Sequence, residues 1–415
     1  MLYQLHEMQR AFLNPLTAFA GAAADLYASP ISPLSYTPMA REIAASYELL
    51  NRLGKEYAKP AFGIEGTREE IAVDKPFCQL RHFIKNAAAK PTGKAKAEPT
   101  ILLVAPLSGH HSTLLRDTVR ALVAEHNVYI TDWRDARMVP LSEGKFDLDD
   151  YIAYVIEFVR LLHTEAKGNL HVISVCQPTV PVLAALSLMA TIKDPATPKT
   201  MTMMGGPIDA RQSPTEVNNL AVTKPYSWFE NQVIYRVPSN YPGFGRRVYP
   251  GFLQHAGFVA MNPDRHMKSH WSFYKDLVKN DGQSVDAHRA FYDEYNAVLD
   301  MDADYYLDTI KIVFQDYALA NGTWVSNALA ATHGPLKVNP AAITKTALFT
   351  IEGELDDISG SGQTRAAHAL CSGVAKANKQ HFEVPEAGHY GIFSGRRWRD
   401  SVQPKIAEFI RTHSK

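Results

Sequence analysis

Residues 170–178 read LHVISVCQP, a run of strand-forming residues that ends at Cys176 and is followed by Pro178 and an apolar helical segment. A short run rich in Val, Ile and Leu is typical of a buried strand in a parallel sheet. A sharp turn from this strand into the helix would place Cys176 at the carboxyl edge of the sheet, where open α/β sheets bind their ligands. The segment therefore predicts both the fold class and the position of a site.

Strand and helix patterns alternate along the chain on both sides of this turn. The predicted strands cover 100–107, 127–132, 170–175 and 200–204, and the predicted helices cover 113–125, 148–165 and 178–192. After a long interruption the alternation resumes with strands over 347–352 and 381–384 and a helix over 402–412. Such alternation is typical of a mostly parallel sheet flanked by helices. We therefore predict an α/β core formed by residues 99–210 and 339–415.

The stretch that interrupts the core, 211–338, is rich in aromatic residues and is predicted to form a lid or cap insertion. Aromatic side chains bury large apolar areas, and some of them can line a binding surface. Four are predicted to contact substrate: Trp228, Phe229, Tyr235 and Trp271. The alternative is that the rings form a small core of the insertion itself, and the sequence does not decide between the two.

Residues 1–98 are predicted to form an N-terminal helical extension and a linker. The apolar residues at its start share one side of a helix: Leu2, Leu5, Met8 and Phe12. A proline-rich break is followed by a second helix over about 39–57, and then by KNAAAKPTGKAKAEP at 85–99, which is typical of a solvated linker.

Composition and cysteine usage narrow the class of protein. The 415 residues include 43 Lys and Arg and 43 Asp and Glu, so the net charge is zero and nucleic acid is not a favoured partner. Cys78, Cys176 and Cys371 fit neither a disulfide framework nor a zinc site, which indicates a reducing compartment. Charged residues near the start argue against a secretion signal, and no apolar run is long enough to span a membrane. We therefore expect a cytoplasmic protein without a transmembrane segment.

Cys176 stands where α/β hydrolases carry the nucleophile on a sharp turn, usually written G-x-S-x-G. Here the turn reads Ser174-Val175-Cys176-Gln177-Pro178. Ser174 is small enough for a close approach of strand and helix, and Pro178 suits the first turn of a helix. A cysteine at a helix N-terminus is favoured as the thiolate, so this position indicates a nucleophile. The alternative is a structural cysteine buried at a strand end.

Two later strand ends carry the remaining groups of a catalytic triad. Asp356 and Asp357 follow the strand at 347–352, and His389 follows the strand at 381–384. Nucleophile, acid and histidine in this chain order are typical of α/β hydrolases. Asp356 is preferred to Asp357 because it lies three residues after Gly353, the first residue of the acidic turn, where the acid of α/β hydrolases commonly falls. In the predicted mechanism, His389 takes the thiol proton of Cys176, the thiolate attacks an ester, and water releases the acyl group.

An oxyanion formed at this nucleophile needs hydrogen-bond donors. One is predicted to be the backbone N–H of Gln177, and the other the backbone N–H of Leu107 or Ser108, in the loop after the first core strand. His110 and His111 follow in that loop. Adjacent histidines point to different sides and no third ligand is near in sequence, so neither a metal nor another cofactor is predicted.

Several segments together resemble intracellular poly(3-hydroxybutyrate) (PHB) depolymerases along nearly the whole chain. They are MLYQLHEMQRAFLNPL, APLSGHH, TDWRDARMVP, VISVCQP, GGPIDAR with SPTEVN after it, and PEAGHYGIFSGRRW. The resemblance implies an α/β hydrolase whose Cys-Asp-His triad maps onto Cys176, Asp356 and His389. It also implies a substrate, the amorphous polymer of storage granules, and a location at the granule surface.

Two alternatives remain beside this interpretation. Polyhydroxyalkanoate synthases have a related fold and a nucleophilic cysteine, and they transfer hydroxyacyl groups from coenzyme A. Their turn keeps a glycine on either side of the cysteine, whereas Ser174 and Pro178 stand here. The second alternative is a granule-surface protein without activity. The sequence leaves open the product lengths, water or coenzyme A as acceptor, homo-oligomer formation, and whether the N-terminal helices or the aromatic insertion bind the granule.

Overall fold

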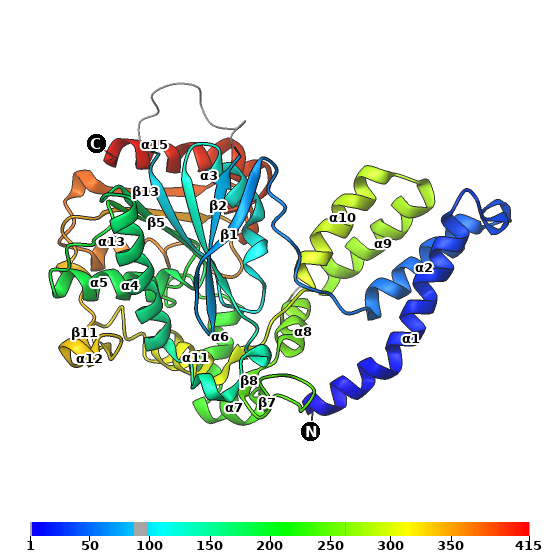
Figure 1. Ribbon diagram of the computed structural model, residues 1–415, viewed down its shortest axis with the longest axis horizontal. Helices are drawn as coiled ribbons and strands as arrows, with labels where there is room; N and C mark the ends of the chain where they lie inside the picture. Colours follow the sequence, from blue (N-terminus) through cyan, green and yellow to red (C-terminus); the bar gives the residue numbers. More distant parts are fainter. Residues whose placement is uncertain (1, 87–97, 262, 415) are drawn as a thin grey trace.

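The computed structural model describes residues 2–86, 98–261 and 263–414, and its centre is an eight-stranded sheet (Figure 1). Most of the linker expected over 85–99 lies outside the described residues. The strands of the sheet are β1 (Thr67–Asp74), β2 (Cys78–Lys85), β3 (Thr100–Val104), β4 (Asn127–Trp133), β5 (Leu170–Val175), β6 (Thr200–Met204), β12 (Ala347–Gly353) and β13 (Lys379–Val384).

The strands lie side by side in the order β1-β2-β4-β3-β5-β6-β12-β13. β2 pairs antiparallel with β1 and with β4, and the remaining pairs are parallel. Helices cover the sheet, and a sharp strand-to-helix turn follows β5. These are the features of the α/β-hydrolase fold, so the predicted fold class is confirmed.

Side chains that alternate along the strands build a core on each face of the sheet. In β3, Leu102 and Val104 belong to one core, and Ile101 and Leu103 belong to the other. The helices that close the two cores are α4 (Leu148–Glu165) with α5 (Thr179–Thr191), and α3 (Arg116–Val123) with α15 (Gln403–His413). Because both faces are covered, the central strands are apolar on both sides, which is why the sequence showed them clearly.

The N-terminal region differs in part from the prediction. Residues 67–85, expected within a helical extension and linker, form β1 and β2 at one edge of the sheet. β1 (TREEIAVD) is mostly exposed and rich in charged side chains, as edge strands often are. It therefore lacks the apolar run of a buried strand, and this part of the prediction is wrong. The other predicted domain boundaries stay predictions.

The chain between β6 and β12 forms several helices and two small sheets. The helices are α6 (Glu216–Thr223), α7 (Tyr226–Gln232), α8 (Gly251–Met261), α9 (Pro263–Lys279), α10 (Gly282–Tyr295), α11 (Ala303–Asp308) and α12 (Ala330–His333). The short strands are β7 (Tyr235–Arg236), β8 (Arg247–Tyr249), β9 (Met301–Asp302), β10 (Val325–Ser326) and β11 (Leu336–Lys337). After β12 come two short helices, α13 (Ala367–Leu370) and α14 (Gly395–Arg397).

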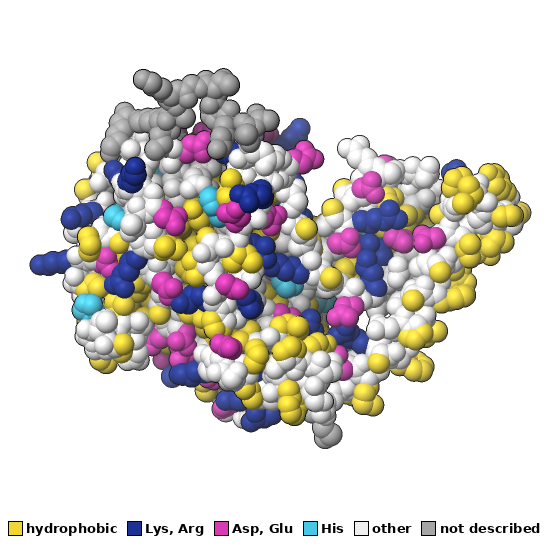
Figure 2. Space-filling view, in the orientation of Figure 1, with side chains coloured by type: hydrophobic (Ala, Val, Ile, Leu, Met, Phe, Trp, Pro, Cys, Tyr) yellow, Lys and Arg dark blue, Asp and Glu magenta, His cyan; other side chains and the backbone are white. Residues whose placement is uncertain are grey.

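The first two helices, α1 (Leu2–Ala28) and α2 (Ala40–Gly54), form an arm that projects from the sheet beside α9 and α10 (Figure 1). The start of α1 is fixed to the insertion by Tyr3, whose buried hydroxyl donates to Asp300 Oδ2 at 2.6 Å. Apolar side chains are exposed along the arm (Figure 2). Along the described chain, no helix is both long and apolar enough to cross a membrane.

Candidate active site

Cys176 lies on a strained turn between β5 and α5. Its φ angle is 68°, a left-handed conformation that is uncommon for residues other than glycine. The N–H of Cys176 donates to the carbonyl of Met204 at 2.7 Å, and the Cys176 carbonyl accepts from Thr179 at 3.1 Å. These bonds hold the backbone in this conformation, so the side chain stands at the carboxyl edge of the sheet. Strain of this kind is often found at functional residues.

Two glycines let the neighbouring strand approach this turn. Gly205 and Gly206 directly follow β6, which pairs with β5. A Cβ atom on Gly206 would lie 1.8 Å from Thr179 Oγ1 and 2.4 Å from the Cys176 carbonyl oxygen. A Cβ on Gly205, which has a φ of 56°, would lie 3.3 Å from His389 Cε1. Glycine is therefore required at both positions by close contact with the site.

Asp356 and His389 form a buried pair beside Cys176. His389 Nδ1 donates to Asp356 Oδ2 at 2.8 Å. The other carboxylate oxygen, Oδ1, accepts the backbone N–H groups of Ile358 at 2.9 Å and Ser359 at 2.8 Å. The next residue, Asp357, is exposed. The carboxylate of Asp356 is thus fixed from both sides and orients the imidazole.

The electrostatic environment of His389 links it to both partners. Complete burial on its own would lower the pKa of His389, but interactions with Asp356 and Cys176 raise it well above its usual value. A histidine whose Nδ1 is bound to a carboxylate has Nε2 available for a third group. The structure therefore brings together the three residues of the predicted triad, with His389 between the other two.

The N–H groups predicted to bind an oxyanion lie in two adjacent loops. β3 and β5 are neighbours, with Val104 opposite Ser174, so the loop that holds Leu107 and Ser108 follows β3 next to the Cys176 turn. In the described part of the chain, the backbone N–H groups of Leu107, Ser108 and Gln177 have no acceptor. They are therefore free to donate to a ligand.

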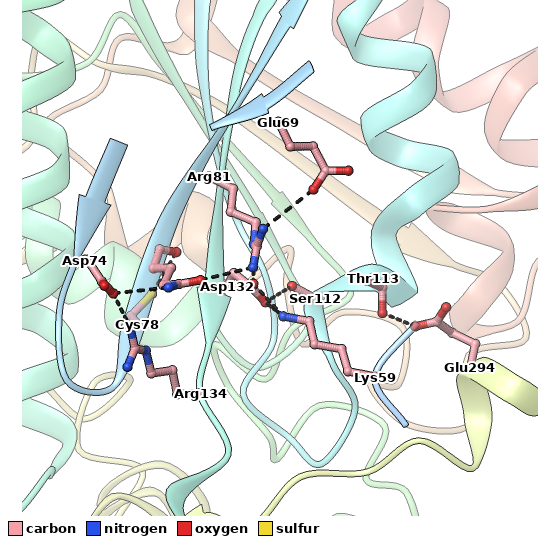
Figure 3. Close-up of polar contacts among 11 residues, drawn as sticks. Lys59, Glu69, Asp74, Cys78, Arg81, Ser112, Thr113, Asp132, Arg134 and Glu294 are labelled. Atoms are coloured by element: carbon pink, nitrogen blue, oxygen red, sulfur yellow. Dashed lines mark hydrogen bonds and ion pairs between the residues drawn. The ribbon is translucent and has the colours of Figure 1, made fainter. Parts of the chain in front are cut away.

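A buried ionic network fixes the loop after β3 (Figure 3). Asp132, near the end of β4, accepts from Lys59 Nζ at 2.5 Å, from Arg81 Nε and from the Ser112 hydroxyl. Burial on its own would raise the pKa of Asp132, but Lys59 and the hydrogen bonds from Ser112 and Arg81 lower it below its usual value. An ionised Asp132 thus ties this loop to the sheet and to the segment after α2.

The same loop is also held from the insertion. The Thr113 hydroxyl donates to Glu294 on α10 (Figure 3). Arg116 lies 2.9 Å from the second oxygen of that carboxylate. The N–H of Leu299 donates to the carbonyl of Gly109 at 2.8 Å. The loop is therefore fixed between the sheet and the insertion, which favours donors with a constant position.

His110 and His111 are both buried in this region. His110 stacks on Phe258, and its Nε2 lies 3.2 Å from the carbonyl of Tyr295. Burial lowers the pKa of each histidine to about 4, so both are neutral near pH 7. Across the described ranges, no group of three or more His, Cys, Asp or Glu side chains is arranged to hold a metal ion.

The four aromatic residues predicted to contact substrate have different environments. Phe229 is buried in a small cluster with Leu307 and Ile310, and Trp228 packs on the edge of that cluster. Tyr235 is half-buried in another cluster of the insertion, whereas Trp271 is exposed on α9 and stacks on Tyr274. Contact of these rings with substrate stays a prediction. The position of Phe229 agrees with the alternative that some rings form the insertion's own core.

Sequence reasoning missed Tyr305, a residue of α11 that interacts electrostatically with Cys176. Its hydroxyl is buried near Cys176 and the side chain of Gln177. Its ring stacks on Tyr151 of α4, with centroids 5.5 Å apart. No motif marks Tyr305, because its place depends on how the insertion folds over the sheet.

Comparison with known protein families gives one match to this chain. Residues 205–414 match the family described as PHB de-polymerase C-terminus. No curated protein sequence matches the chain.

Solved structures of several hydrolases are similar in shape at low sequence identity. A thermophilic esterase from Thermogutta terrifontis is 11% identical with a TM-score of 0.42, over 84% of this chain and 99% of that one. A monoacylglycerol lipase from Paleococcus ferrophilus is 12% identical with a TM-score of 0.41, over 76% of this chain and 96% of that one. Likenesses this distant carry no argument about function.

The family match spans just over half of the chain and includes Asp356 and His389. The sheet order and the turn after β5 independently give the α/β-hydrolase fold. The chain therefore belongs to the PHB depolymerase family of α/β hydrolases, whose reaction class is the hydrolysis of ester bonds.

Proposed function

We propose that this protein hydrolyses the ester bonds of PHB, with Cys176 as nucleophile, His389 as base and Asp356 as the acid. The observation that carries the proposal is the contact of His389 with both partners: a 2.8 Å hydrogen bond to Asp356 and a pKa that interactions with Asp356 and Cys176 raise. A Cys-His pair oriented by a carboxylate is the arrangement that activates a thiol for acyl transfer.

The proposed reaction has two steps. His389 Nε2 takes the thiol proton of Cys176, and the sulfur attacks the ester carbonyl carbon to give a tetrahedral oxyanion. As the carbon–oxygen bond breaks, His389 returns the proton to the departing oxygen, which leaves as a hydroxyl chain end. Water, deprotonated by His389, then attacks the thioester and releases the acid and the thiol. No metal or other cofactor takes part in these steps.

The free backbone N–H groups support the charged intermediate in this scheme. Gln177 is the residue after the nucleophile, and its N–H is the first donor we propose. Leu107 or Ser108 supplies the second from the loop after β3. That loop is anchored by Ser112 to the ionised Asp132. Fixed donors are effective because they need no reorganisation as charge develops.

We further propose that the arm attaches the enzyme to the polymer granule in the cytoplasm. One side of α1 carries large exposed apolar side chains at helical spacing: Leu5, Met8, Phe12, Leu16 and Phe19. Phe12 is 75% exposed, which is unusual for so large an apolar side chain. A continuous apolar surface of this kind marks an interaction site.

The charges of α1 favour an uncharged polyester over an anionic membrane. Helices that bind anionic lipid carry several Lys or Arg residues on their polar face. In α1 the basic residue Arg10 is paired with Glu7, at 3.0 Å, and with Glu56. The exposed side of α1 described above is apolar and uncharged, which suits contact with an uncharged polyester.

Granule attachment can be tested by sedimentation with amorphous PHB granules. Met8→Glu combined with Phe12→Glu should reduce sedimentation strongly, with unchanged hydrolysis of a soluble nitrophenyl ester. Trp271→Glu is the matched control, because Trp271 is an exposed aromatic residue of the insertion. Loss of binding only in Trp271→Glu would assign attachment to the insertion. Conversion of a dimer to a monomer by the arm variant, with granule binding intact, would assign the arm to an interface between two copies.

The catalytic proposal is tested by release of 3-hydroxybutyrate from amorphous granules. We expect release by the wild type without coenzyme A and none by Cys176→Ala. Cys176→Ser should keep the fold and lose most activity, because a hydroxyl needs stronger assistance from the base. Release that requires coenzyme A, or consumption of hydroxyacyl-coenzyme A without release, would instead support the acyltransferase alternative.

A further inference from the structure

Two buried polar side chains beside Cys176 have no role in the mechanism above. Tyr305 is 1% exposed and Gln177 is 9% exposed. Within the described residues, the Tyr305 hydroxyl and both polar atoms of the Gln177 amide form no hydrogen bond of standard geometry, although the two side chains lie close enough to interact with each other. Burying polar groups without a partner is costly, and such groups usually bind water or a ligand.

The two side chains interact with each other, and both are close to Cys176. Gln177 follows Cys176 in the chain, and the buried hydroxyl of Tyr305, on α11 of the insertion, interacts electrostatically with Cys176 and with the Gln177 side chain. Burial raises the pKa of the Tyr305 hydroxyl well above its usual value, Cys176 raises it further, and Gln177 and Thr309 lower it. The hydroxyl therefore stays protonated and can donate a hydrogen bond.

The ring of Tyr305 is rigidly placed. It stacks on Tyr151, with the ring planes 16° apart, and lies 5.9 Å from the ring of Phe146. The backbone N–H of Tyr305 donates to the carbonyl of Phe146 at 3.1 Å. A polar group on a fixed ring is suited to select among ligands, because it cannot move away from a ligand that lacks the matching atom.

We propose that Tyr305 and Gln177 form a subsite that binds the oxygen on carbon 3 of the acyl group held at Cys176. This inference rests on the proposed function, in which that acyl group is a 3-hydroxybutyryl unit. Its carbon-3 oxygen lies near the thioester carbonyl, and is an ester oxygen within a polymer or a hydroxyl at a chain end. The Tyr305 hydroxyl donates to either form, and the Gln177 amide can both donate and accept.

The subsite makes the enzyme selective for 3-hydroxyacyl esters. A buried site built to hydrogen-bond a substrate oxygen rejects an analogue that lacks it, because its own polar groups are then left unpaired. The experiment compares kcat/KM for nitrophenyl 3-hydroxybutyrate and nitrophenyl butyrate. We expect the wild type to prefer the hydroxylated ester, and Tyr305→Phe to reduce that preference about tenfold. Tyr306→Phe is the control, since Tyr306 packs on Phe229 and Tyr249 instead.

Three outcomes separate the subsite from the proposed function. An unchanged preference in Tyr305→Phe, whatever its overall activity, would overturn the subsite and leave a packing role for the hydroxyl. If Tyr305→Phe does not fold, Gln177→Met should reduce the preference, and an unchanged preference there counts equally against the subsite. Hydrolysis of both esters by Cys176→Ala would overturn the proposed function and the subsite together.

Discussion

At the scale of single residues, Asp356 is the group whose replacement is most informative. Its carboxylate holds His389 and is itself held by two backbone N–H groups. We predict that Asp356→Asn keeps the fold and lowers kcat/KM by at least about a hundredfold, because an amide neither fixes the imidazole tautomer nor offsets its charge. Hydrolysis of a soluble 3-hydroxybutyrate ester measures the loss, and thermal unfolding checks the fold.

The same substitution should change the protonation of His389. Burial alone lowers the pKa of His389, so removing the charge of Asp356 lowers that pKa. The imidazole of His389, followed by NMR, should then lose its proton at lower pH than in the wild type. Asp357→Asn is the matched control, because Asp357 is the exposed neighbour. A larger loss of activity in Asp357→Asn would reassign the acid.

The residues of the candidate triad could be selected from the sequence because each follows a strand of one parallel sheet. Cys176 follows β5, Asp356 follows β12 and His389 follows β13, so all three reach the same edge. Tyr305 could not be selected in this way. It lies on a six-residue helix of the insertion, and its place near Gln177 depends on tertiary packing that no local pattern records.

At the scale of secondary-structure elements, one buried arginine joins the insertion to the core. Arg246, which precedes β8, donates to the carbonyls of Val139, Pro140 and Gly144 at 3.0, 2.7 and 2.8 Å. It also pairs with the buried Asp302 at 2.8 Å. We predict that Arg246→Met destabilises the protein by about 3–5 kcal/mol, because it leaves Asp302 buried without its partner. Chemical unfolding followed by tryptophan fluorescence measures the change.

A neighbouring arginine provides the control for this prediction. Arg247 pairs with Glu230 at 3.0 Å, and both side chains are about two-fifths exposed. Because exposed pairs contribute about 0–1 kcal/mol, Arg247→Met should change stability by less than about 1 kcal/mol. Equal losses of stability in the two variants would show that burial of the Arg246–Asp302 pair does not increase the cost of removing the arginine.

Elements were predictable in proportion to how fully the sheet buries them. The predicted strand 170–175 and helix 148–165 have the observed bounds of β5 and α4. The start of α4 is also marked locally, because Asp147 and Asp150 cap it reciprocally. β1 and β2 were missed because a charged edge hairpin has one solvent-facing side and a weak apolar pattern.

At the scale of the whole molecule, buried neutral histidines make stability depend on pH. His171 is fully buried in β5, where Nδ1 lies 2.9 Å from the Thr200 hydroxyl, and burial lowers its pKa to about 3. Between pH 6.5 and 3 the unfolded chain binds a proton at this residue and the folded chain does not. Acid therefore favours unfolding. The contribution of His171 to the free energy of unfolding should fall by about 1.4 kcal/mol for each unit by which the pH is lowered in this range.

The measurement compares unfolding free energies of the wild type and His171→Gln from pH 7 to pH 5. A glutamine keeps polar atoms near Thr200 and does not titrate. The wild type should lose stability relative to the variant as the pH falls below 6.5. Parallel profiles for the two proteins would show that His171 does not contribute to acid sensitivity.

The left-handed backbone at Cys176 has a consequence for the protein's tolerance of mutation. An L-residue at a φ of 68° costs about 1 kcal/mol that glycine does not incur. Cys176→Gly should therefore unfold at a higher temperature than Cys176→Ala, although the proposed mechanism predicts that both lack activity. A stability screen that ignores activity would favour glycine here, so under the proposed mechanism a cysteine persists at this strained position only while catalysis is selected.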